Sequence, residues 1–320
     1  MLKPVFKIKI GSETYEPGTQ SPVLSVVVDL NMDIPADSFE IVLGVDDNTL
    51  QIKEGDDATV ELGYEDELKK VFTGSIDNVV PTMTTLRVRG LNYASKLLEL
   101  RVNKVFEKQP AGKIVSDLAK TAGVKEDTVK PGITFPYYVI DDSKNAYDHI
   151  KELAELCGYD VYMTNENKLM FKNHEKKDTH TLEYGVNIIN ADYDEDRPMI
   201  KSINVQGESP SSFKGADTSH WLTKRSVDGM SGSGSGVLFT HPALRDKDTA
   251  SKVAKAIMDS LLRNLSGTVE TVGNADVKLG DSIEVKGMTN SKMNGEFQVR
   301  SVEHQMNKSK GFITTIGWRK

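Results

Sequence analysis

Histidine and cysteine are the side chains whose spacing could form a metal site or a catalytic site in this chain. The sequence contains one cysteine and six histidines, at His149, His174, His180, His220, His241 and His304. None of the histidines belongs to a His-Glu-x-x-His or similar pattern, and Cys157 has no cysteine partner. Zinc sites need several such ligands at short, regular spacing. The sequence therefore predicts no metal site and no cofactor.

Two of these residues, His149 and Cys157, lie in a segment with helical apolar periodicity. Cys157 falls on the apolar stripe of that segment, where a free cysteine usually acts as a small core residue. His149 lies within the same helix. A structural role is the favoured interpretation for both residues.

The acidic run at residues 192–196 has the alternating acidic residues of a calcium loop. An EF-hand loop needs glycine at its sixth position and glutamate at its twelfth. Those positions hold Arg197 and Ile203, so a solvated strand end is the better interpretation. Neither a Gly-x-Ser-x-Gly elbow nor a P-loop occurs, and the Ser/Gly run at 231–236 lacks the Gly-Lys-Ser/Thr of phosphate-binding loops. We therefore expect no catalytic residues and no enzymatic activity.

Composition narrows the class of protein. The 320 residues fit two or three domains, and no stretch approaches the roughly 18 consecutive apolar residues of a membrane span. The net charge of −7 argues against a general nucleic-acid binder, but it is compatible with a channel through which nucleic acid passes. The single cysteine fits a reducing cytoplasm, and residues 1–10 alternate like a strand and do not resemble a signal peptide.

One pattern occurs twice in the chain. Residues 52–63 and 277–287 each place an apolar residue, Lys and then Gly-Asp before an alternating strand that ends in Gly. Two further strands follow each copy. Gly-Asp between alternating runs indicates a turn, because glycine accepts positive φ and aspartate can bond to nearby backbone. The repeat predicts two small antiparallel β-barrels related by internal duplication.

The remaining elements divide the chain into three predicted domains. Residues 1–101 form the first barrel, with strands at 5–10, 23–29, 38–43, 58–62, 71–80 and 86–89. Residues 102–173 form a small α/β domain whose helices end at Gly123 and Gly158, the second capped by Ser143, followed by a hairpin at 159–163 and 169–172. Residues 174–320 form the second barrel, with strands at 179–184, 188–193 and 199–207, a flexible loop at 208–236, and a helix at 248–265 capped by Asp248 or Thr249. The fold class is mainly β with an α/β insertion.

An ordered set of motifs carries a family resemblance. It comprises residues 72–77 and 86–90, the helix from 111 to Gly123, the segment 143–158 with its hairpin, and the C-terminal segments 273–281, 294–299 and 301–304. In this order the motifs resemble the late control gene D family of phage tail proteins. That family includes the baseplate hubs of contractile phages and the N-terminal part of type VI secretion spike proteins.

The resemblance implies a structural hub: two barrels related to the tail-tube protein, assembled as a homotrimer. Three duplicated chains present six similar surfaces, which would adapt the hexameric tail tube to the trimeric central spike around an axial channel. Implied partners are the tail tube ring, the spike, other baseplate proteins and, as a further candidate, the tape measure protein, with no specific nucleic-acid binding. The chain lacks needle repeats after its last strand, so we expect the spike to be a separate protein.

The resemblance also implies a location, and one alternative function remains open. The protein would be made in the bacterial host cytoplasm and assembled into a virion tail or a tailocin-like particle. The alternative is a tail-associated cell-wall-degrading or glycan-binding protein with residues 102–173 as the active part. The apolar residues of that segment fit two helices packed on a hairpin, and no convergent set of His, Asp or Glu marks a site there.

Overall fold

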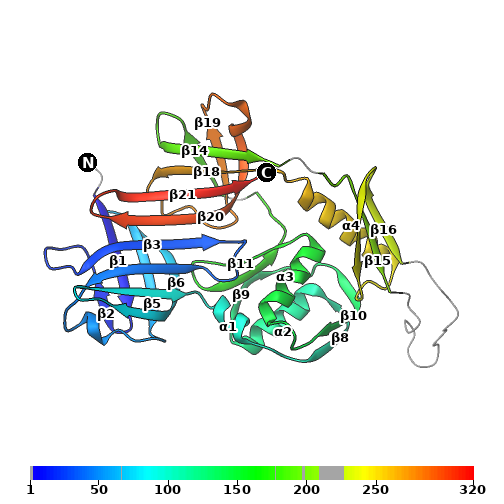
Figure 1. The fold of residues 1–320 in the computed structure, drawn as a ribbon, viewed down its shortest axis with the longest axis horizontal. Coiled ribbons are helices and arrows are strands. Elements are labelled where there is room, and N and C mark those ends of the chain that lie inside the picture. Colours follow the sequence, from blue (N-terminus) through cyan, green and yellow to red (C-terminus); the bar gives the residue numbers. More distant parts are fainter. Residues whose placement is uncertain (1–2, 66, 177, 197–198, 209–226) are drawn as a thin grey trace.

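The computed structural model describes residues 3–65, 67–176, 178–196, 199–208 and 227–320, and its fold is mainly β. Figure 1 shows two strand-rich parts beside a helical part, with a further small sheet and helix α4 at the far end. The predicted mainly β class is confirmed. Most strands belong to one 13-stranded, largely antiparallel sheet, and the ladders of the described residues do not close into a barrel.

The first strand-rich part comes from the N-terminal residues. Its strands are β1 (Pro4–Ile10), β2 (Glu13–Tyr15), β3 (Val23–Asn31), β4 (Ser38–Gly44), β5 (Asp57–Tyr64), β6 (Glu67–Pro81) and β7 (Thr85–Leu91), with a 3-10 turn η1 (Thr49–Gln51). They pair in the order β2-β1-β5-β6-β7-β4-β3. Alternate residues such as Val26, Val28 and Leu30 are buried, as expected for strands with one face on a core.

The second strand-rich part repeats this order. Its strands are β13 (Thr179–Glu183), β14 (Ile188–Glu195), β18 (Leu265–Val272), β19 (Ser282–Lys286), β20 (Gly295–Asn307) and β21 (Gly311–Arg319), with a 3-10 turn η3 (Ser291–Met293). They pair in the order β13-β19-β20-β21-β18-β14. Taken in chain order, the six strands β13, β14, β18, β19, β20 and β21 occupy the positions that β1, β3, β4, β5, β6 and β7 occupy in the first part. One difference is that β13 runs parallel to β19, whereas β1 runs antiparallel to β5.

The two Gly-Asp turns also have the same hydrogen bonds. Gly55 and Gly280 have φ of +88° and +82°, values that favour glycine. The Gly55 N–H donates to the Ile76 carbonyl (2.9 Å), and the Ile76 N–H donates to the Asp56 carbonyl (2.8 Å). In the second copy, Gly280 and Asp281 exchange the corresponding bonds with Val299 (3.1 and 2.9 Å). The predicted turns are therefore confirmed at both positions.

The β-bulges match as well. The β6–β7 ladder shifts register between Ile76 and Asn78, and the β20–β21 ladder shifts between Val299 and Ser301. The β3–β4 ladder shifts between Val23 and Ser25, and the β14–β18 ladder shifts between Ile188 and Asn190. A bulge inserts one residue at a defined place, so these shifts fix a residue-by-residue equivalence between the two parts.

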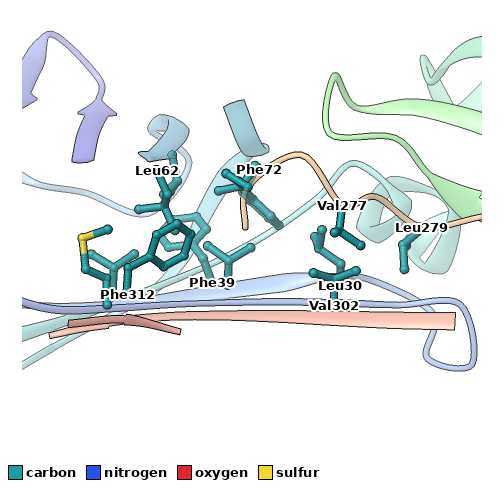
Figure 2. Close-up of a cluster of buried hydrophobic side chains, with 14 of the residues drawn as sticks. Leu30, Phe39, Leu62, Phe72, Val277, Leu279, Val302 and Phe312 are labelled. Carbon is teal, nitrogen blue, oxygen red and sulfur yellow. The ribbon is translucent and has the colours of Figure 1, made fainter. Parts of the chain in front are cut away.

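The two parts are joined by a direct pairing of β20 with β3. The pairing runs antiparallel from Ser301 opposite Asn31 to Asn307 opposite Ser25. Figure 2 shows the resulting shared core, in which Leu30, Phe39, Leu62 and Phe72 lie in one cluster with Val277, Leu279, Val302 and Phe312. Burial of this apolar surface is the main stabilising term of the joint.

The helical part lies between them in sequence. It contains α1 (Ala94–Glu99), β8 (Lys104–Pro110), α2 (Ala111–Ala122), β9 (Lys125–Val129), β10 (Thr134–Ile140), α3 (Ala146–Cys157), β11 (Asp160–Met163) and β12 (Lys168–Lys172). The predicted hairpin and both helices are confirmed, and Gly123 and Gly158 end the helices in left-handed conformations. Four elements were not predicted from the sequence because their residues lack a clear period: α1, β8, β9 and β10.

A second insertion separates β14 from β18. It contains β15 (Ser202–Gly207), β16 (Asp228–Gly232), β17 (Gly236–His241) and α4 (Lys247–Leu261). Its buried residues Val205, Leu244 and Val253 share one apolar cluster with Ile114 and Leu153 of α2 and α3. The insertion therefore packs on the helical part, although the chain reaches it from the second strand-rich part.

Two predicted helix caps are wrong. Asn145, and not Ser143, caps α3 by accepting a hydrogen bond from the Asp148 N–H (2.9 Å). Asp246, and not Asp248 or Thr249, caps α4 by accepting from the Thr249 N–H (2.8 Å). In both cases another polar side chain stood two or three residues from the true cap, so composition alone did not choose between them.

The predicted loop at 208–236 is partly wrong. Residues 209–226 lie outside the described residues. Residues 228–232 form β16 and Gly236 begins β17, so the Ser/Gly run is a turn within a small sheet. Gly229 allows β16 to lie directly against α4, because a Cβ there would come within 2.4 Å of the Ala250 backbone. The predicted strand at 199–207 begins only at Ser202.

Arg300 lies where the two strand-rich parts and the helical part meet. It is the extra residue of the β20 bulge. Its guanidinium bonds to Asp160 of β11 and to Asp33 of the β3–β4 loop, each at 2.5 Å. Asp160 also accepts a hydrogen bond from Gln298 (2.8 Å). Because Arg300 and Asp160 side chains are each only 13% exposed, this ion pair is well shielded from solvent.

We predict that Arg300→Met lowers the free energy of unfolding by about 3–5 kcal/mol, because it leaves the Asp160 carboxylate buried without its counter-charge. Urea denaturation followed by fluorescence measures the change. Arg89→Met is the matched control, since Arg89 pairs with Glu40 (2.6 Å) at a site where it is 54% exposed, and we expect it to cost about 0–1 kcal/mol. Equal losses in both variants would contradict the role given to Arg300.

Candidate functional site

The outward face of the central strands carries a row of carboxylates. In the ladder registers, Glu270 of β18 lies opposite Thr315, which lies opposite Glu303 of β20, which in turn lies opposite Asp29 of β3. These residues alternate with the buried residues of their strands, so their side chains point away from the core. The row crosses the joint between the two strand-rich parts.

This row is electrostatically unfavourable. Partial burial raises the pKa of Asp29. Partial desolvation, followed by the charge of Asp29, raises the pKa of Glu303. Like charges directly opposite each other on neighbouring strands destabilise a sheet. An isolated fold gains nothing from such a pair, which marks this face as a candidate functional surface.

A second polar group lies beside a cavity of about 330 Å³ between α3, β10 and the end of β17. Glu152 of α3 is its centre. It accepts hydrogen bonds from His241 Nε2 and Lys144 Nζ, both at 2.6 Å. The Ala243 N–H donates to His241 Nδ1 (3.2 Å), which leaves the His241 proton on Nε2, directed at Glu152. The contact fastens the insertion with β15–β17 to the helical part.

The chemistry of this cluster is that of a structural clamp. The hydrogen bond from His241 lowers the pKa of Glu152 to about 2, against partial burial and with help from Lys144. A carboxylate held ionised in this way is a poor general acid. Burial raises the pKa of Tyr138, which stacks on His241 at a ring distance of 6.2 Å, so its hydroxyl stays protonated.

The residues singled out in the sequence lie apart from one another. Cys157 ends α3, accepts a hydrogen bond from the Ile133 N–H (3.3 Å), and has its pKa raised by burial to about 11, so it is a partly buried, protonated thiol. His149 is buried in α3 and bonds the Asp141 carbonyl (3.0 Å). The acidic run at 192–195 forms the exposed end of edge strand β14.

No described residues form a group of three or more His, Cys, Asp or Glu side chains placed to hold a metal ion. Among the helices of the described ranges, none combines the length and apolar character needed to cross a bilayer.

Neither the Glu152–His241 clamp nor the ion pairs of Arg300 were predicted from the sequence. The two members of the clamp are 89 residues apart, and Arg300 is 140 residues from Asp160. No local pattern marks either pair.

We predict that Glu152→Gln destabilises the protein by about 1–3 kcal/mol at neutral pH, because it removes a charge-assisted hydrogen bond. The pKa of Glu152 is lower in the folded protein than its ordinary 4.5. Its contribution is therefore complete above about pH 4.5 and is lost as the pH falls toward 2.

Denaturation curves across this pH range measure the effect. The difference between wild type and Glu152→Gln should shrink as the solution is acidified. Glu155→Gln, one turn further along α3 at an exposed position, is the control and should change little. A difference between wild type and Glu152→Gln that does not change with pH would contradict the clamp.

Solved structures with the same fold come from phage tails and a related secretion system. The 43 kDa tail protein of prophage MuSo2 from Shewanella oneidensis matches with TM-score 0.75 and 15% identity, covering 99% of this chain and 98% of that one. A tail protein from Neisseria meningitidis MC58 matches with TM-score 0.73 and 13% identity, covering 99% and 97%. The resemblance to phage tail proteins is confirmed at the level of fold over the whole chain.

A third structure extends the likeness to type VI secretion. The E. coli c3393 protein, described as a component of that system with structural similarity to the T4 tail proteins gp27 and gp5, matches with TM-score 0.62 and 11% identity, covering 98% of this chain and 76% of that one. No curated protein sequence matches the chain. A family model described as the Alg8 N-terminal domain matches residues 39–308. The chain therefore belongs to the Alg8 N-terminal domain family.

Proposed function

We propose that this protein is a structural hub subunit of a phage tail or phage-tail-like injection particle. Three copies form a ring with pseudo-six-fold symmetry, which connects a six-fold tail tube to a three-fold central spike. The similarity in fold to phage tail proteins supports the proposal that the chain is part of such a particle. The internal repeat supports the proposal that three copies form a ring of six similar units.

The observation that carries this proposal is the residue-level match between the two strand-rich parts. They share their strand order, their Gly-Asp hydrogen bonds and the positions of two bulges. Such agreement favours duplication of one tube-like barrel. A trimer of a duplicated chain presents six similar units, which resolves the mismatch between six-fold and three-fold partners.

The proposed domains follow from the repeat. Residues 1–101 are the first tube-like barrel, residues 102–173 the α/β domain, and residues 174–320 the second barrel. The apolar cluster shared by α2, α3, β15 and α4 favours assigning the insertion of the second barrel to the body of the α/β domain. The open ladders favour barrels that are completed by neighbouring copies in the ring.

The row of carboxylates on the outward face supports the proposal of an axial channel. In a ring of three chains the outward face of the central strands would line the lumen, with Asp29, Glu270 and Glu303 facing the passing DNA. Negative charge repels phosphates and keeps DNA from binding to the wall. In this proposal, the repulsion between Asp29 and Glu303 lowers the stability of the fold, and the same negative charge lets DNA pass without binding to the wall.

The alternative function, a cell-wall enzyme or glycan-binding protein centred on residues 102–173, has weaker support. Glu152, the carboxylate beside the cavity in that region, is held by His241 and Lys144. Glycoside cleavage needs a protonated acid beside a second carboxyl group. We infer that the chain acts through assembly and not through catalysis, with the tail tube, the spike and other baseplate proteins as partners.

We predict that the purified chain forms a homotrimer with about three times its 35.4 kDa mass. Light scattering coupled to size exclusion measures the absolute mass. Imaging of the particles along their axis should then show six similar lobes. A protein that remains a monomer at high concentration contradicts the proposed ring.

We predict that the double variant Asp29→Asn, Glu303→Gln is at least as stable as wild type, because it removes an opposed pair of like charges. In assembled particles it should slow DNA delivery, because a less repellent wall interacts with phosphates. Glu99→Gln, at an exposed position of α1, is the control. Unchanged delivery by particles carrying the double variant would overturn the proposed channel lining.

A further inference from the structure

The joint between the two strand-rich parts uses one flank of a single strand. On that flank, β20 pairs first with β19 over Gly295–Gln298 and then with β3 over Ser301–Asn307. The opposite flank pairs with β21. Partner exchange occurs at the bulge that contains Arg300.

The equivalent strand of the first part, β6, has the same flank only half used. β6 pairs with β5 over Glu67–Ser75, and its opposite flank pairs with β7 as far as Pro81. Beyond the bulge, residues 78–81 have no strand of the described chain on the β5 flank. Asn78, Val80 and Pro81 are exposed, with Val80 at 42%.

The equivalent of β3 in the second part is β14, and among the strands of the described residues none pairs with its outer flank. β14 pairs with β18 on one side and forms the end of the large sheet on the other. Ile189 is 54% exposed. The N–H of Glu195 donates to the side chain of its neighbour Asp194 (2.8 Å), which is how an edge strand satisfies an unpaired amide.

We propose that β6 of one copy pairs antiparallel with β14 of the next copy, which repeats between chains the β20–β3 joint made within each chain. This inference rests on the proposed trimeric ring and specifies its interface. The matched bulges fix the register: Val80 is equivalent to Glu303, and Asp194 is equivalent to Asp29. Val80 therefore faces Asp194, and Val79 faces Glu195.

The charges fit this pairing. Within the chain the equivalent position opposes two carboxylates, Glu303 and Asp29. Between chains Val80 replaces Glu303, so Asp194 meets no like charge. Arg87 lies opposite Val80 on β7, where it is 50% exposed and pairs with Glu40 (3.6 Å), so a basic side chain is next to the proposed position of Asp194.

Pro81 limits the pairing to a short segment. It has no N–H to donate, and prolines at strand edges oppose unspecific strand addition. The proposed interface thus combines a free strand edge with a proline that limits further strand addition. A head-to-tail contact of this type closes into a ring when its rotation permits.

Paired cysteines test the register. In a Cys157→Ala background, Val80→Cys with Asp194→Cys places one thiol on each interacting edge, and directly opposed strand residues are close enough for a disulfide. Mild oxidation should give covalent dimers and trimers on non-reducing gels. The chain supplies its own positive control, because Asp29→Cys with Glu303→Cys should form the equivalent disulfide within one chain.

A further cysteine pair tests whether cross-linking depends on the proposed register. Val80→Cys with Asp192→Cys shifts one member by two residues and should cross-link much less. Trimers by light scattering without a Val80–Asp194 cross-link, or with stronger cross-linking of the shifted pair, would overturn this interface while the proposed function stands. Monomers throughout, with the internal control disulfide formed, would overturn the proposed function and this interface together.

Discussion

The sharing of β20 among three neighbouring strands is the constraint on which the rest of the structure depends. β19 and β3 follow one another on one flank of β20, and β21 occupies the other. The bulge that permits this exchange places Arg300 against Asp160 and Asp33. One strand thus unites both β parts and anchors them to the helical part through a shielded ion pair.

The same construction explains features that a self-contained fold would not need. The joint opposes Asp29 and Glu303 across neighbouring strands. Among the described strands, none pairs with the β5 flank of β6 beyond Ser75 or with the outer flank of β14. Each feature costs stability or risks aggregation in an isolated molecule. Both would be useful in the proposed ring, where outward carboxylates would line the channel and free edges would meet the next copy. The structural observations therefore favour assembly over chemistry, and the Glu152 clamp belongs to the framework.

Local patterns in the sequence predicted the local structure well. Gly55-Asp56 and Gly280-Asp281 were identified because a turn needs a residue that accepts positive φ, and both have it. Apolar periodicity located α2 and α3 and the hairpin after them. The caps of α3 and α4 were misplaced because several polar residues competed for each. β8, β9 and β10 were missed because their burial depends on what packs over them.

The sequence by itself determined that the chain is a mainly β protein containing a repeated unit, because turn chemistry and alternation are properties of neighbouring residues. Tertiary structure alone decided how the units join, which edges remain open and which distant charges meet. Asp29 and Glu303 are opposed only because β3 pairs with β20. Glu152 meets His241 across 89 residues because α4 and its sheet fold back on α3. Such contacts depend on ladder register and packing, which no local pattern encodes.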